Sequence, residues 1–392
     1  MILESIQNIE RYKEESTFSG ESVKKALDFI ISKIDQSLDT FTDKFPAASS
    51  INLVYPAIDN TCWTASFWTG MLWLAYEYTG ENKYKDVAMK QVKSFRERLN
   101  HEDLINTHDI GFLYTLSCVA AYKITGDEFA KETALLAADK LMKRYFPIAG
   151  IIQAWGDLSD PEQQGRLIID CCMNLPLLYW ASEITGDNKY KDAAVSHVKQ
   201  AAKYIVREDS STYHTFYMDV KTGAPRFGST CQGFSDDSCW ARGQAWAIYG
   251  FPLSFGYTKD RDILNLTSHV ANYFLNRLPD DDISYWDLSL SGDNINRDSS
   301  SSAIAACGLL EYCRFLDNDK NLQKIYKNAS ISMLKNLTDK CATVTHPESN
   351  GLLLHAVYDM PKNVGVDECN IWGDYFYFEG LMRLNRDWKK YW

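Results

Sequence analysis

One carboxylate stands in an otherwise apolar stretch of the sequence. The stretch reads Arg-Leu-Ile-Ile-Asp-Cys-Cys-Met-Asn-Leu-Pro-Leu-Leu-Tyr-Trp and covers residues 166–180. Loss of hydration raises the pKa of a carboxyl group, so Asp170 is a candidate for an acid that still holds its proton near neutral pH. The alternative is structural, because an aspartate in this place also suits the cap of the helix that follows.

Further side chains that could do chemistry lie before other apolar segments. Asp109 follows His108, and His214 stands between an aromatic residue and a threonine. Two carboxyl groups in different surroundings are the usual equipment for acid and base catalysis on sugars. Asp109 and Asp170 therefore form a candidate catalytic pair, with two helix caps as the alternative. The two histidines support this interpretation, although a lone histidine is more often structural.

Arg242 and Trp246 are four residues apart, which places them on one side of a helix. A guanidinium fork suits a substrate carboxylate, and an indole suits the face of a sugar ring. A buried arginine that ties down a loop explains the pattern equally well.

Several catalytic motifs are missing from the sequence. It contains no His-Glu-x-x-His, no Cys/His cluster, no Gly-rich phosphate loop and no Gly-x-Ser-x-Gly. Asp280, Asp281 and Asp282 follow a proline between expected helices, which indicates a solvated loop and not an acidic metal cluster. We therefore expect no catalytic metal.

The overall composition favours a globular enzyme with a carbohydrate site. The 392 residues include 11 Trp, 23 Tyr and 18 Phe, and aromatic faces stack on sugar rings. A net charge of −11 argues against nucleic-acid or anionic-membrane partners, which need a basic surface. The first residues are charged too early for a signal peptide, and no apolar run reaches the roughly 20 residues of a membrane span. The 10 cysteines are scattered without a Cys-x-x-Cys pair, so we expect reduced core residues in a cytoplasmic protein.

A repeated turn signal organises the chain into helices. Thr-Gly followed by an acidic residue occurs at 79–81, 125–127 and 185–187. Glycine suits the left-handed residue that ends a helix, and the acid suits the first turn of the next. The helices before these signals are apolar almost all round, whereas those after them are amphipathic, so the pattern predicts inner helices alternating with outer ones.

This alternation predicts an all-α fold in which six inner and six outer helices close as a double ring, an (α/α)6 barrel, with residues 1–392 as a single catalytic domain. The inner helices are expected near 63–78, 109–124, 173–184, 238–256, 299–315 and 373–384. The outer helices include 22–38, 188–206, 260–277 and 319–338. A hairpin near 213–227 is the one expected strand pattern. The inner helices all run the same way, so their N-termini, with Asp109 and Asp170 among them, should meet at one positive rim.

The longest motifs resemble those of the unsaturated glucuronyl hydrolases, glycoside hydrolase family 88, over nearly the whole chain. The residues that carry the resemblance are the segments 108–114, 166–178, 232–246 and 371–377. They include the His-Asp pair at 108–109, the stretch around Asp170, the Trp-Ala-Arg-Gly-Gln-Ala-Trp run at 240–246 and Ile-Trp-Gly-Asp at 371–374.

The resemblance implies an (α/α)6 barrel that needs no metal or cofactor and acts on disaccharides produced by polysaccharide lyases. Such substrates, here unsaturated glycosaminoglycan disaccharides, carry a 4,5-unsaturated glucuronic acid, and the family hydrates the double bond to release a keto acid and the neighbouring sugar. Asp170 matches the general acid and base, and Asp109 the second aspartate. The implied substrate-binding residues are His108, His214, Gln232, Arg242, Trp246, Trp63, Trp155 and Tyr358.

Two features depart from the family pattern. Some members recognise sulfate through a loop with serines and a lysine before the last inner helix, and the segment 358–367 keeps Lys362 without the serines. The segment 63–67 also differs in detail. The rival enzyme interpretations are an unsaturated rhamnogalacturonyl hydrolase, against which the His108-Asp109 motif argues, and a sugar epimerase on the same barrel. A non-enzymatic helical-repeat scaffold is the third alternative.

Overall fold

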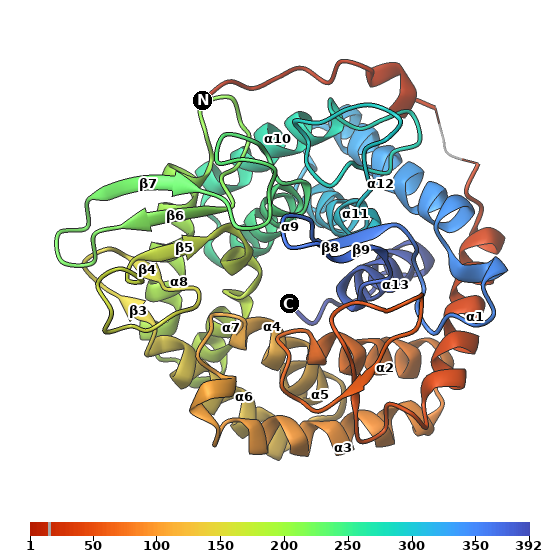
Figure 1. Cartoon of the computed structure of the whole chain (residues 1–392), viewed down its shortest axis with the longest axis horizontal. Coiled ribbons are helices and arrows are strands. Elements are labelled where there is room, and N and C mark those ends of the chain that lie inside the picture. Colours follow the sequence, from red (N-terminus) through yellow and green to blue (C-terminus); the bar gives the residue numbers. More distant parts are fainter. Residues whose placement is uncertain (15–16) are drawn as a thin grey trace.

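The computed structural model describes residues 1–14 and 17–392, and helices dominate it. Helices near the centre of Figure 1 are surrounded by helices at its periphery. The inner helices are α2 (Ala65–Thr79), α4 (Ile110–Tyr114) with its continuation α5 (Ala120–Thr125), α7 (Pro176–Thr185), α9 (Ala241–Thr258), α11 (Ser299–Cys313) and α13 (Ile371–Asn385). The outer helices are α1 (Gly20–Ser37), α3 (Asn82–Arg98), α6 (Glu128–Met142), α8 (Asn188–Gln200), α10 (Arg261–Leu275) and α12 (Lys320–Lys340).

The predicted turn signals end the inner helices. Gly80, Gly126 and Gly186 adopt left-handed backbone angles with φ of 76°, 73° and 74°. At two of these turns the acid that follows caps the next helix: Asp127 accepts a hydrogen bond from the Ala130 amide and Asp187 from the Lys189 amide. Glu81, at the first turn, makes no capping hydrogen bond. The predicted alternation of inner and outer helices is thus produced by short local turns.

A fourth turn of the same kind lacks glycine. Lys259 takes the left-handed conformation at the end of α9, with φ of 59°, and Asp260 caps α10 through the Asp262 amide. The Thr-Gly-acid pattern does not predict this turn, because Lys259 replaces the glycine between Thr258 and Asp260.

Two inner segments differ from the expected continuous helices. The segment predicted at 109–124 changes to wider π-helical turns at Thr115–Val119 between α4 and α5. The segment predicted at 173–184 begins with a 3-10 turn at Ile169–Met173, called η4 here, before α7 starts at Pro176. Proline is well tolerated in the first turn of a helix because that position has no amide partner to lose.

Small antiparallel sheets interrupt the helices, so the all-α prediction was incomplete. The hairpin predicted near 213–227 is present as β6 (Thr215–Met218) and β7 (Pro225–Ser229), and β5 (Arg166–Ile168) pairs with the other edge of β6. The remaining pairs are β1 (Phe45–Pro46) with β2 (Ala57–Ile58), β3 (Tyr145–Phe146) with β4 (Ile151–Ile152), and β8 (Ala356–Asp359) with β9 (Val364–Glu368).

The core lies between and inside the inner helices. Helices α2, α9, α11 and α13 bury nearly every side chain, including Trp73, Trp246 and Trp372 at 0% exposure. All ten cysteines are unpaired in the structure, and eight of them are buried, which agrees with the predicted core positions. Among the described residues no helix is both long and apolar enough to span a membrane.

Candidate active site

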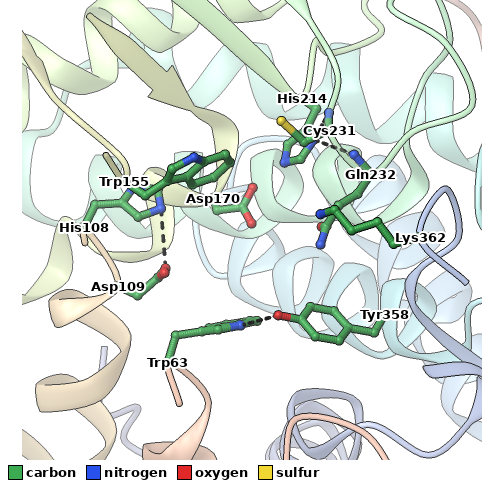
Figure 2. A pocket seen from close by; sticks show the side chains of 10 residues that line it. All are labelled: Trp63, His108, Asp109, Trp155, Asp170, His214, Cys231, Gln232, Tyr358 and Lys362. Atoms are coloured by element: carbon green, nitrogen blue, oxygen red, sulfur yellow. Dashed lines mark hydrogen bonds and ion pairs between the residues drawn. The ribbon is translucent and has the colours of Figure 1, made fainter. Parts of the chain in front are cut away.

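A cavity of about 370 Å³ opens where inner helices begin and where the β5–β6–β7 sheet ends (Figure 2). It brings together eight of the predicted site residues and two that were not predicted. The lining residues are Trp63, His108, Asp109, Trp155, Asp170, His214, Cys231, Gln232, Tyr358 and Lys362. The predicted meeting of Asp109 and Asp170 at one rim is therefore present in the structure.

Strand pairing places Asp170 beside His214. Ile168 in β5 lies opposite Thr215 in β6, and the Ile169 amide donates to the His214 carbonyl at 3.2 Å. The chain then turns into η4, which directs the Asp170 carboxyl toward the middle of the cavity (Figure 2). The β6–β7 hairpin thus positions His214, and η4, which leads into α7, positions Asp170.

Asp170 is an acid with a raised pKa. Burial raises the pKa to about 7, and the neighbouring Asp109 adds to the rise, whereas Arg242 and the indole N–H of Trp246 act in the opposite direction. The Oδ2 atom is buried and has no hydrogen-bond partner of ordinary geometry among the described residues. Asp170 does not cap α7, which begins six residues later, so the structure does not support the helix-cap interpretation.

Asp109 has a different environment. Thr107 Oγ1 donates to its Oδ2 at 2.8 Å, and His108 Nε2 lies 3.4 Å from its Oδ1. Burial raises its pKa to about 6, while hydrogen bonds from Thr107 and Asn174 and the charge of Arg144 lower it. Its side chain makes no capping hydrogen bond at the start of α4. The two carboxyl groups therefore differ in how readily each holds a proton.

The two predicted histidines are neutral. Burial lowers the pKa of both His108 and His214 to about 3. His214 Nδ1 accepts the amides of Cys231 at 3.0 Å and Gln232 at 3.2 Å, so the single ring proton must sit on Nε2. His214 is thereby a hydrogen-bond donor beside Asp170.

Aromatic side chains form the walls of the cavity. Trp63 Nε1 donates to the Tyr358 hydroxyl at 3.1 Å, and its ring stacks on Trp372 with centroids 5.4 Å apart. Trp155 is 37% exposed at the mouth, and the Arg166 guanidinium lies 4.8 Å from its ring centroid. Apolar faces at the mouth and hydrogen-bonding groups deeper inside suit a sugar.

Arg242 and Trp246 lie beneath the cavity and outside its lining. The guanidinium pairs with Asp298 at 3.1 Å and donates to the Tyr358 carbonyl at 2.7 Å and to Gln232 Oε1 at 3.2 Å. These contacts favour the alternative interpretation, in which the arginine ties down loops: it holds two walls of the cavity. Trp246 is fully buried below Asp170.

Sequence reasoning did not select Cys231 and Lys362 as site residues. Lys362 is held by Asp359 at 2.7 Å, and this hydrogen bond raises its pKa. It lies in the turn between β8 and β9, which the sequence singled out only for its relation to sulfate recognition. Cys231 is brought to the cavity by the hydrogen bonds that fix His214. In the described part of the chain no group of three or more His, Cys, Asp or Glu residues could hold a metal ion.

Comparison with known proteins identifies the family. Residues 33–368 match the family model of Glycosyl Hydrolase Family 88. The chain belongs to this family. Curated relatives match over the full chain: the unsaturated chondroitin disaccharide hydrolase of Streptococcus pneumoniae is 48% identical over 391 residues, covering 100% of this chain and 98% of the relative.

Solved structures of similar proteins agree with the fold. The crystal structure of unsaturated glucuronyl hydrolase from Streptococcus agalactiae has a TM-score of 0.97 at 46% identity, covering 100% of this chain and 99% of that one. A mutant of the same enzyme in complex with dGlcA-GalNAc6S has a TM-score of 0.90 at 43% identity, with the same coverage. The mostly helical fold and the family 88 assignment made from the sequence are thus confirmed.

Proposed function

We propose that this family 88 member is an unsaturated glucuronyl hydrolase that hydrates the 4,5 double bond of unsaturated glycosaminoglycan disaccharides. The observation that carries the proposal is the pair of carboxyl groups in one cavity, with pKa values of about 6 for Asp109 and about 7 for Asp170. The names of the relatives support the substrate class. The whole chain then forms one catalytic domain, and its inner and outer helices form an (α/α)6 barrel.

Asp170 supplies and recovers the proton in this mechanism. Its protonated carboxyl gives a proton to C4 of the unsaturated ring, where the electrons of the double bond form the new C–H bond. Positive charge develops at C5 and on the ring oxygen. Water then adds to C5 and gives a proton back to the Asp170 carboxylate, and the resulting hemiketal collapses to a keto acid and the neighbouring sugar.

Asp109 acts as the charged partner. It loses its proton more readily than Asp170, so at neutral pH it is the ionised member of the pair. A carboxylate at this place stabilises positive charge that develops at C5 and also keeps the proton on Asp170 through repulsion. The environment of each carboxyl therefore sets its role.

The walls of the cavity hold the unsaturated sugar in place. The Nε2–H of His214 is available as a donor beside Asp170, and Gln232 is fixed next to it by Arg242. Trp63 and Trp155 offer apolar faces for the two sugar rings. The ammonium group of Lys362 brings positive charge to the cavity of a protein with a net charge of −11, which favours an anionic substrate.

The conjugated double bond absorbs ultraviolet light, which gives a direct test. Purified protein should bleach the absorbance of unsaturated disaccharides from hyaluronan, chondroitin or heparin and release the neighbouring sugar. In D2O the product should carry deuterium at C4, since Asp170 exchanges its proton with solvent. Unchanged absorbance on all three disaccharides would contradict the proposal, and sugar release without bleaching would exclude hydration as the reaction.

A further inference from the structure

The segment 386–392, called the tail here, enters the space enclosed by the inner helices from the side opposite the cavity. Figure 1 shows the end of the chain at the centre of the molecule. Trp392 is 1% exposed, and its indole Nε1 donates to Glu379 Oε2 at 2.8 Å. A large aromatic side chain of the tail is thus a component of the core.

The tail is fixed to several inner helices. Trp388 Nε1 donates to Glu77 Oε2 of α2 at 2.9 Å, and Lys123 Nζ of α5 donates to the Tyr391 carbonyl at 2.7 Å. Lys390 Nζ pairs with Glu311 of α11 at 2.7 Å. Contacts to helices on different sides of the ring give the Trp392 indole a defined position.

Three aromatic rings separate Trp392 from the cavity. Phe112 of α4 and Phe376 of α13 lie on two sides of Trp246 of α9, with centroid distances of 5.3 Å and 5.5 Å. Trp392 stacks on Phe376 at 5.9 Å with an interplanar angle of 9° and meets Phe112 edge-on at 5.9 Å. The indole therefore contacts both rings that hold Trp246.

Trp246 connects this layer to the candidate acid: its buried indole N–H and the buried Oδ2 of Asp170 both lack another hydrogen-bond partner among the described residues, and the indole lowers the pKa of Asp170. We infer that Trp392 is a positioning residue for Asp170: it supports the layer of Phe112, Trp246 and Phe376 from below and keeps water out of it. The inference rests on the proposed function, in which Asp170 is the acid. Protein interiors are close-packed, so removal of a supporting ring leaves a space into which its neighbours move or water enters.

Charged and titratable groups lie around both ends of the layer. Asp109 from the start of α4 and Arg242 from α9 act on Asp170 by charge. The other titratable groups on this side include Cys171 and Cys172 of η4, together with His108, His214, Cys231, Tyr358 and Lys362 around the cavity. The groups near Trp392 are Glu311, Glu379, Arg383 and Lys390, which pair with one another.

The test is the pH dependence of kcat for double-bond hydration in Trp392→Leu, Trp392→Phe and the parent protein. An acid must be protonated to act, so activity falls as pH rises through the pKa of Asp170. Burial is the largest cause of the raised pKa of Asp170, and the N–H of Trp246 is a smaller effect in the opposite direction. Water that enters the layer should therefore lower this pKa, and Trp392→Leu should move the alkaline limb of the profile to lower pH by roughly half a unit or more. Trp392→Phe keeps the stacked ring and should keep the limb in place. KM should change little, because Trp392 does not line the cavity.

Trp388→Phe is the matched control, since it alters an indole of the same tail outside the aromatic layer and should leave the limb unmoved. A folded Trp392→Leu variant with the parent pH profile overturns the inference. If that variant does not fold, Phe376→Leu interrupts the same layer one ring nearer to Trp246, and an unmoved limb there overturns it equally. An inactive parent protein refutes the proposed function itself, whereas an active parent with unmoved limbs refutes only the role of Trp392.

Discussion

At the scale of single residues, two aspartates differ because their neighbours differ. Asp109 receives hydrogen bonds from Thr107 and Asn174, which favour its charged form. The charge of Asp109 raises the pKa of Asp170 further, and the opposing effects of Arg242, a backbone N–H and Trp246 are smaller, so the pKa of Asp170 is the higher of the two. One acid and one carboxylate are thus available near neutral pH without a metal ion in the mechanism.

Asp170→Asn should abolish hydration, because the amide cannot give a proton to C4 or take one from water. General acid–base groups contribute roughly 10²–10⁴-fold, and we expect a loss of kcat near the upper end of that range, since one side chain carries both steps. Loss of ultraviolet absorbance under saturating disaccharide measures it. Thermal unfolding should show that the variant is folded, and activity close to that of the parent would remove Asp170 from its role.

Asp109→Asn should change the pH profile as well as the rate. The parent profile should be narrow, with an acid limb near pH 6 from Asp109 and an alkaline limb near pH 7 from Asp170. The substitution removes the acid limb. It also removes a negative charge that raises the pKa of Asp170, so the alkaline limb of the residual activity should move to lower pH. An alkaline limb that stays in place or rises would contradict the coupling of the two carboxyls.

At the scale of elements, the site depends on a close approach of α4 to the end of η4. The Phe112 amide donates to Asn174 Oδ1, and a Cβ added to Gly111 would lie 2.3 Å from the Asn174 Cα. Gly111 follows Asp109 by two residues, and Asn174 follows Asp170 by four. The absence of a side chain at Gly111 therefore lets the segments that carry the two candidate catalytic carboxyls pack together.

Gly111→Ala should separate these segments and reduce activity. The methyl group meets backbone atoms, which cannot move aside as a flexible side chain can, so we expect destabilisation of about 1–3 kcal/mol and a fall in kcat larger than the rise in KM. Thermal unfolding and steady-state kinetics measure both effects. Gly256→Ala is the control within α9, where the nearest atom to the added Cβ is 3.7 Å away. Equal changes in melting temperature and kcat in the two variants would contradict a role for the close packing at Gly111.

The sequence predicted elements formed by local signals better than those formed by distant pairing. Thr79-Gly80 and its repeats predicted the helix ends because a left-handed glycine is a local requirement. The pairing of β5 with β6 joins Ile168 to Thr215, far apart in the chain, and no local pattern announces it. Lys362 was missed as a lining residue for the same reason. Arg242 was assigned to substrate because its partners, Asp298 and the Tyr358 carbonyl, come from remote elements.

At the scale of the whole molecule, carboxyl groups and histidines change the folding stability with pH in opposite directions. Burial raises the pKa of Asp109, Asp170 and Asp374 and lowers that of His108, His197 and His214. The carboxyls favour the folded state at low pH, and the neutral histidines favour it at higher pH. If only the carboxyls or only the histidines had shifted pKa values, the free energy of unfolding would change steeply with pH. The two kinds together reduce this change.

Asp170→Asn should therefore stabilise the protein more at pH 8 than at pH 5. The folded pKa of about 7 lies above the ordinary value of 3.8, so the parent residue favours folding at low pH, and this contribution is lost as pH rises through 7. Asparagine cannot ionise and avoids the penalty of a buried charge at pH 8, while the histidines act alike in both proteins and cancel in the difference. Melting temperatures of variant and parent at the two pH values measure the effect, with the exposed Asp86→Asn as a control that should show no such difference. A gain in melting temperature that is equal at both pH values, or larger at pH 5, would mean that folding does not raise the pKa of Asp170.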